Sequence, residues 1–190
     1  MSEMAALPNE ITPYRMSVDE FYRIGDLLDE DRTELLDGVI VAVSPVSVAH
    51  GARAAAITIA LGNAFGSRAV VIAGGSMTVD RYDAPLPDVS VLRPLLPDAG
   101  TYASVEQALC VVEVAKSSLT RDLHYKAHLS ARAGVADYLV ADIDGDVVHH
   151  HTGPSPGGYA SVAVLRHGAT FSIAAFPDIV LRADAFLAPR

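Results

Sequence analysis

Two acids, Glu113 and Asp88, and one lysine, Lys126, lie in or beside predicted core elements, where a charged side chain needs a chemical explanation. Glu113 is enclosed by six apolar residues in the run 109–116, which is rich in β-branched side chains. Such a run is typical of a strand that is covered on both faces of a sheet. An isolated carboxylate that loses its water costs several kcal/mol or is neutralised by a raised pKa. Glu113 is therefore expected to have a partner, either a structural Arg or Lys or a divalent metal ion.

Together with Glu113, Asp88 and Lys126 form a group of residues that could carry out hydrolysis. Asp88 lies at the mouth of the predicted strand 86–92, and Lys126 lies on the helix predicted after the Glu113 strand. Two acids on neighbouring strands suit Mg²⁺ or Mn²⁺, which prefer oxygen ligands and keep several waters. The metal lowers the pKa of a bound water, and a lysine can orient that water or stabilise charge on phosphorus. These residue types together predict phosphodiester hydrolysis.

Three further residues have a functional and a structural interpretation each. Glu34 precedes a predicted hairpin and either approaches the metal or is a surface acid. His50, in the first turn of a predicted helix, either contacts a phosphate or water or serves in capping or packing. Asp122 is either an accessory site residue or a helix N-terminal acid that the dipole favours. It can also pair with Lys126 four residues later, which is the structural alternative for that lysine.

The elements that must position these residues are strands alternating with helices. Ser17 and Glu20 form a capping box for a helix to about Leu28, and Asp37-Gly38 predicts the turn of a hairpin over 34–43. The other expected elements are a helix from Ser47 to Phe65 ended by Gly66, strands over 68–73, 77–80 and 86–92, a helical turn over 104–108, the strand 109–116, a helix capped by Ser118 or Thr120 and closed by Gly134, strands over 135–142 and 146–152, a loop over 154–158, and a strand or two before a short helix at 183–187.

Other motifs carry weaker signals. The triplet His149-His150-His151 invites a metal interpretation, but alternation along a strand turns the middle side chain away from its neighbours. Gly74-Gly75 is no phosphate loop, because no Lys-Ser/Thr pair follows it into a helix. The single cysteine, Cys110, excludes an internal disulfide and is expected to pack as a small hydrophobe.

Length and composition fit one globular domain. The chain has 190 residues, of which 51% are hydrophobic, and we expect a flexible segment over 1–15 and one domain over 16–190. No apolar run reaches the roughly 18 residues of a membrane span, and residues 1–13 lack the basic cluster of a secretory signal, so a cytoplasmic protein is expected. The net charge of −9 argues against a general nucleic-acid binder, although it allows a local basic groove.

The order of these motifs resembles the PD-(D/E)xK restriction-endonuclease superfamily. More closely, the chain resembles the Uma-type family of predicted restriction endonucleases, from about residue 16 to 182. The matching segments are 34–38 (ELLDG), Ser44-Pro45 with His50 in the next helix, 87–91 (PDVSV), 111–114 (VVEV), 122–126 (DLHYK) and 134–142 (GVADYLVAD).

This resemblance implies an α/β (α+β) fold, with a mixed sheet in an α-β-β-β-α-β core flanked by helices, preceded by the N-terminal helix and the hairpin. It also implies a Mg²⁺ or Mn²⁺ site at Asp88 and Glu113. The superfamily lysine lies two residues after the second acid, where this chain has Ala115. The family resemblance points to Lys126 instead, because alternation turns the competitor Lys116 to the face opposite Glu113.

The first hypothesis is a metal-dependent DNA endonuclease in which Asp88, Glu113 and Lys126 are catalytic. Double-strand cutting by this fold needs two active sites, so the resemblance also implies a homodimer. The second hypothesis is a non-catalytic nucleic-acid-binding or protein-interaction module on the same fold, which the acidic balance and Ala115 favour. A third is a metal-dependent phosphodiesterase that acts on RNA or a small nucleotide.

Overall fold

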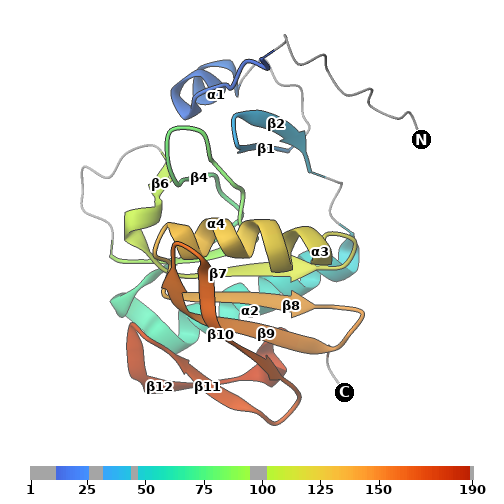
Figure 1. Cartoon of the computed structure of the whole chain (residues 1–190). Coiled ribbons are helices and arrows are strands. Elements are labelled where there is room, and N and C mark those ends of the chain that lie inside the picture. The colour runs from blue at the N-terminus through green and yellow to red at the C-terminus, as the bar shows by residue number, and fades with distance from the viewer. Residues whose placement is uncertain (1–11, 26–31, 44–46, 95–101, 189–190) are drawn as a thin grey trace.

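The computed structural model describes residues 12–25, 32–43, 47–94 and 102–188 (Figure 1). The helices are α1 (Val18–Ile24), α2 (Val48–Phe65), α3 (Leu119–Arg121) and α4 (Ala127–Arg132). The strands are β1 (Thr33–Leu36), β2 (Val39–Ala42), β3 (Val70–Ala73), β4 (Met77–Thr78), β5 (Val89–Leu92), β6 (Ala103–Ser104), β7 (Ala108–Ala115), β8 (Asp137–Asp142), β9 (Val147–Ser155), β10 (Gly158–Leu165), β11 (Thr170–Ile173) and β12 (Phe176–Arg182). The domain boundaries stay a prediction.

A six-stranded mixed sheet forms the centre of the molecule. Its strand order is β10-β9-β8-β7-β5-β3, in which β7 and β8 run parallel and the other neighbours run antiparallel. Along the chain, α2, β3, β5, β7, the α3–α4 helical segment and β8 follow one another. The predicted α-β-β-β-α-β core is therefore confirmed, and β9 and β10 extend the sheet beyond it.

The sheet is covered on both faces, which explains the nearly continuous apolar character of β7. On one face, Val112 and Val114 pack in a cluster with Ile57 of α2. On the other face, Val111 packs in a cluster with Ala127 of α4. Figure 1 shows α2 behind the sheet and α4 in front of it. Because side chains alternate along a strand, Glu113 projects to the α4 face with Val111.

The N-terminal elements follow their capping signals. Ser17 and Glu20 form the predicted capping box of α1, which ends at Ile24, while Leu27 and Leu28 lie outside the described residues. Ser47 caps α2 by accepting a hydrogen bond from the His50 N–H. These caps satisfy N–H groups that have no partner inside a helix.

The predicted hairpin is confirmed as β1–β2. Asp37 and Gly38 adopt φ values of 52° and 76°, the left-handed conformation that a tight hairpin turn requires. The backbones of Leu35 and Ala84 exchange two hydrogen bonds of 2.8 and 3.1 Å, which dock the hairpin beside the chain that leads to Asp88. This docking brings Glu34 of β1 towards the centre of the molecule.

The helix predicted to follow β7 is interrupted by a wide turn. Residues 122–126 form a π-helical turn between α3 and α4, in which the Asp122 carbonyl accepts both the Ala127 N–H and, at 2.9 Å, the Tyr138 hydroxyl. Thr120 is not the cap, because it lies inside α3. Ser118 occupies the cap position, but its hydroxyl donates to Asp122 at 2.5 Å instead of accepting an N–H. Gly134 follows α4 with a φ of 81°, as predicted.

The C-terminal third contains more strand than the sequence suggests. The predicted loop over 154–158 is wrong, because β9 continues to Ser155 and pairs with β10 from Gly158. Two more strands, β11 and β12, then form a separate antiparallel pair before a 3-10 helix at Ala183–Phe186. Polar and glycine residues interrupt the hydrophobic pattern of β9 to β12, so the sequence predicted fewer strands than the structure has. Within the described ranges, no helix combines the length and hydropathy needed to cross a bilayer.

Alternation along β9 separates the histidines of the triplet. The His150 ring packs on Phe171 and its Nε2 lies 2.7 Å from an Asp137 carboxylate oxygen. The neighbouring His151 packs edge-on against Tyr138 on the α4 face, and its Nε2 is buried without a hydrogen bond. Burial, reinforced by the other two histidines, lowers the pKa of His151 to about 4.

We expect His151→Phe to make the protein more stable and less sensitive to acid. Because His151 has a folded pKa below its unfolded value near 6.5, its neutral form supports the fold above pH 6.5, and that support is lost as pH falls towards 4. The substitution keeps an aromatic ring and removes the nitrogen that has no hydrogen bond. We expect this to raise the free energy of unfolding by about 1 kcal/mol at pH 7. Urea unfolding at pH 7 and pH 4.5 measures both effects. His150→Phe is the matched comparison and should destabilise, because it leaves Asp137 without its histidine partner.

Candidate active site

The pairing of β5 with β7 brings the two predicted acids to the same end of the sheet. β5 and β7 are antiparallel, and their register ends at Val89 opposite Val112. Asp88 immediately precedes β5, Glu113 immediately follows Val112, and both line the same cavity. The negative charge of Asp88 raises the pKa of Glu113, as expected for neighbouring carboxylates. The register thus brings together two acids that are widely separated along the chain.

Asp88 is held in place by contacts to both of its oxygens. Its Oδ2 accepts the Val114 N–H at 2.8 Å, and its Oδ1 lies 2.9 Å from His50 Nε2. Burial alone would raise the pKa of Asp88, but the hydrogen bonds from His50 and from the Val114 N–H outweigh it and lower the pKa. Asp88 is therefore a fixed, ionised carboxylate, and His50 contacts it directly.

Among the acids of the site, Glu113 has the pKa that departs most from its usual value. Only 3% of the residue is exposed, and Lys126 Nζ donates to its Oε1 at 3.1 Å. Burial raises the pKa of Glu113 well above its usual value; the charge of Lys126 opposes this rise, and the nearby carboxylates of Asp88, Asp122 and Glu34 add to it. A further cation would relieve this accumulation of negative charge.

Lys126 joins two buried carboxylates from different elements. Its Nζ lies 2.5 Å from Glu34 Oε1 and 3.1 Å from Glu113 Oε1, and 5% of its side chain is exposed. Burial lowers the pKa of a lysine, but the adjacent Glu113 and Glu34 more than compensate and raise it. The ammonium group is therefore charged and oriented by the two acids.

Glu34 is part of this site and not a surface acid. The residue is fully buried, and its Oε1 accepts the Leu86 N–H at 2.9 Å in addition to the Lys126 contact. Its Oε2 is buried without a hydrogen bond. The β1–β2 hairpin thus delivers a third carboxylate, with one unsatisfied oxygen.

Asp122 lies in the same region, but it does not form the expected ion pair with Lys126. No Asp122 carboxylate oxygen lies within 4.0 Å of Lys126 Nζ, whose ion-pair partners are Glu34 and Glu113. The π-helical turn is the reason, because its i to i+5 hydrogen bonding removes the alignment of residues four apart. Asp122 is instead held by Ser118, while its Oδ1 is buried without a hydrogen bond. Burial is the main cause that raises the pKa of Asp122.

The two candidate lysines differ in their surroundings. Lys116 is exposed and lies on the wall of the cavity that also contains Asp88 and Glu113. Lys126 makes the direct contacts to Glu113 and Glu34. The geometry therefore places the amine of Lys126, and not that of Lys116, at the second acid.

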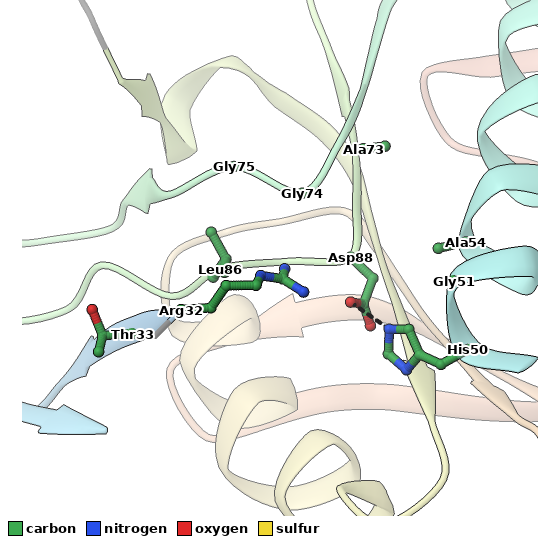
Figure 2. A pocket seen from close by; sticks show the side chains of 10 residues that line it. All are labelled: Arg32, Thr33, His50, Gly51, Ala54, Ala73, Gly74, Gly75, Leu86 and Asp88. Carbon is green, nitrogen blue, oxygen red and sulfur yellow. Dashed lines mark hydrogen bonds and ion pairs between the residues drawn. The ribbon is translucent and has the colours of Figure 1, made fainter. Parts of the chain in front are cut away.

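These side chains line two neighbouring cavities that share some of their lining residues. One cavity of about 330 Å³ contains Asp88, Glu113 and Lys126. The other, of about 540 Å³, shares His50, Asp88 and Arg32 with it. Figure 2 shows Arg32 and His50 extending towards Asp88 from opposite sides. The site is thus a hollow at the ends of β5 and β7, and the smaller cavity is lined by four acids (Asp88, Glu113, Asp122 and Asp144) and four basic residues (Arg32, Lys116, Arg121 and Lys126).

Arg32 and Arg121 are cavity residues that the sequence analysis missed. Arg32 precedes β1 and lines both cavities, and Arg121 lies between the Glu34 and Asp122 carboxylates at 4.0 and 3.9 Å. One signal was available for Arg121. A cation in the first turn of a helix opposes the helix dipole, which suggests a reason other than helix stability.

The residues fit a divalent cation, although no complete cluster is preformed. Among the described residues, no three His, Cys, Asp or Glu side chains converge as a ready metal site. Mg²⁺ in nucleic-acid enzymes, however, uses one or two carboxylates and keeps several waters. Asp88 and Glu113 supply two carboxylates, and the unsatisfied oxygens of Glu34 and Asp122 are hard acceptors nearby. This donor set suits Mg²⁺ or Mn²⁺.

The fold is shared with a protein of solved structure. A solved structure from Anabaena variabilis, described as "a putative nuclease belonging to DUF820", matches with a TM-score of 0.72 and 16% sequence identity. The match covers 90% of this chain and 97% of that chain. At this identity the likeness shows the shared fold.

The family follows from the sequence itself. The model of the Uma2 family, described as "Putative restriction endonuclease", matches residues 18–184. The chain therefore belongs to the Uma2 family, and the resemblance inferred from its motifs is confirmed. A comparison with curated proteins gives no match.

Proposed function

We propose that this protein is a metal-dependent endodeoxyribonuclease that hydrolyses phosphodiester bonds at the Asp88–Glu113 site. The observation that carries the proposal is the buried Lys126 ammonium group, 3.1 Å from the Glu113 carboxylate in a cavity that Asp88 also lines. Membership of a family described as restriction endonucleases supports a nucleic-acid substrate. The grouped carboxylates of Asp88, Asp122 and Glu34, which raise the pKa of Glu113, support a bound cation that would relieve their repulsion.

Each residue has a chemical role in this proposal. Asp88 and Glu113 would hold Mg²⁺ or Mn²⁺, which when bound lowers the pKa of a water and neutralises charge on the phosphate. His50 fixes the orientation of Asp88 through its 2.9 Å contact. Lys126 orients the attacking water or stabilises charge that develops on the phosphoryl oxygens. Glu34 and Asp122 act as accessory acids that keep the lysine charged.

A specific observation favours the alternative of a non-catalytic module on the same fold. The Lys126 ammonium group is bonded to two carboxylates, and only 5% of its side chain is exposed. An amine held in this way can serve the fold without touching substrate. In that case Lys126 replaces the cation that the acids otherwise need.

Titration calorimetry with Mn²⁺ separates the two proposals. We expect the native chain to bind Mn²⁺ at millimolar or lower concentrations and Glu113→Gln to lose this binding, because the variant lacks a charged ligand. Glu106→Gln, at an exposed position before β7, is the matched control and should bind like the native chain. Bound Mn²⁺ should also raise the melting temperature, since it favours the folded state. Absence of binding by the native chain would support the non-catalytic module.

We further propose a homodimer, since cutting both strands of a duplex requires two active sites. Sedimentation velocity on the native chain, with and without Mg²⁺, tests this directly. A single species at twice the 20.0 kDa chain mass is the expected result. A persistent monomer that nevertheless linearises plasmid DNA would contradict it.

A further inference from the structure

A groove of about 730 Å³ adjoins the cavity that contains the two acids Asp88 and Glu113, here called the acidic cavity, and runs along the hairpin and the α3–α4 helical segment. Leu36 and Val41 line it from the hairpin, and Tyr125 lines it from the π-helical turn. Ser117, Ser118 and Arg121 line both this groove and the acidic cavity. The groove has fewer charged residues than the cavity that it joins, although Asp37 and His124 also line it.

Arg121 at the junction has unused hydrogen-bonding capacity. Its guanidinium lies 4.0 Å from Glu34 and 3.9 Å from Asp122, too far for hydrogen bonds, and its Nε has no acceptor among the described residues. About a third of the side chain is exposed. The two acids thus hold the cation in place while its donors stay free. A guanidinium in this state suits an oxyanion such as a phosphate, which it can bind with two hydrogen bonds.

Tyr125 presents an aromatic ring in the groove. Its hydroxyl donates to Asp83 at 3.3 Å, while 41% of the residue is exposed. Burial and the carboxylate of Asp83 raise the pKa of Tyr125 to about 12, so the hydroxyl stays protonated. An exposed ring with a fixed edge is a stacking surface for a nucleobase, whatever the base.

We propose that a DNA strand runs from the acidic cavity into this groove, with Arg121 on a phosphate and Tyr125 stacked on the adjoining base. Leu36 and Val41 then form the apolar wall beside that nucleotide. A guanidinium without hydrogen-bond partners among the described residues, beside an exposed aromatic ring, favours a nucleotide over other occupants, because the first suits a phosphate and the second a base. This inference rests on the proposed nuclease function and assigns the position of its substrate.

Fluorescence anisotropy with a labelled DNA strand and its duplex tests the proposal. The measurements use the full chain with Asp88→Asn, which leaves the labelled DNA intact. We expect Tyr125→Ala to weaken binding about tenfold and Tyr125→Phe to preserve it, since the ring remains. Arg121→Ala should weaken binding to a similar extent and lower the slope of log affinity against log salt by about one. Arg166→Ala, an exposed arginine that lines neither cavity, should change the slope little.

A second pair of variants distinguishes a local effect on DNA binding from a loss of folding. Val41→Glu places a carboxylate in the groove and should repel the DNA backbone, whereas Val39→Glu adds the same charge to the same strand outside the groove. We expect at least about tenfold weaker binding for Val41→Glu alone. Equal melting temperatures for the two variants confirm that the difference is local.

The possible outcomes separate the inference from the function on which it rests. If the native chain cleaves DNA but the Arg121, Tyr125 and Val41 variants bind as tightly as their controls, the groove assignment is overturned. If these variants lose binding while the native chain fails to cleave, the groove stands and hydrolysis fails. If the chain neither binds nor cleaves DNA, or the groove variants affect RNA binding alone, the DNA assignment is overturned.

Discussion

Replacing Asp88 by Asn or Ala is expected to reduce Mn²⁺-dependent DNA cleavage by at least about a thousandfold. Stabilisation of transition-state charge by a bound metal is worth several kcal/mol, and each 1.36 kcal/mol corresponds to a factor of ten in rate. Asn retains an oxygen for the Val114 N–H but loses the charge that attracts the cation. Linearisation of supercoiled plasmid over a range of Mn²⁺ concentrations gives the rates.

Two measurements make this result specific to the site. Asp178→Asn, an exposed residue paired with Arg68, should cleave at the native rate. The melting temperature of Asp88→Asn should remain within a few degrees of the native value, because the amide fits the same place. Native cleavage by the Asp88 variants would exclude Asp88 as a metal ligand.

Lys126→Met is expected to destabilise the fold by about 3–5 kcal/mol. Removing one partner of a buried ion pair leaves the other charge uncompensated, and here two carboxylates, Glu34 and Glu113, lose the same ammonium group. Burial raises the pKa of Glu113 and the charge of Lys126 opposes this rise, so without Lys126 the folded variant should hold the Glu113 proton to higher pH than the native fold does. The deficit of the variant should therefore grow as pH rises above about 4.5. Urea unfolding between pH 4.5 and pH 8 measures it.

The other lysine and the acids provide controls. Lys116→Met is the same substitution at an exposed position and should alter stability by less than about 0.5 kcal/mol. Glu34→Gln combined with Lys126→Met should recover much of the loss, because one of the two uncompensated charges disappears. If Lys116→Met abolished cleavage while Lys126→Met preserved it, the roles assigned to the two lysines would be reversed.

Much of the fold was predictable because its signals are local. The capping box at Ser17, the cap at Ser47 and the turn at Asp37-Gly38 each depend on residues within one turn of chain. Predictions failed where local and tertiary preferences compete. The π-helical turn is the clearest case, since the Asp122 carbonyl that receives the Ala127 N–H also accepts the hydroxyl of Tyr138, a residue on another strand.

The sequence by itself determined that Glu113 needs a partner, because a carboxylate in a buried strand cannot remain alone. It also determined the family, through the order of Asp88, Glu113 and the helix that carries Lys126. Only the tertiary structure decided that Glu34 reaches the same lysine and that Lys126 does not pair with Asp122. The first depends on the docking of the β1–β2 hairpin, and the second depends on the π-helical turn at 122–126. Packing between segments that are distant in the sequence determines both.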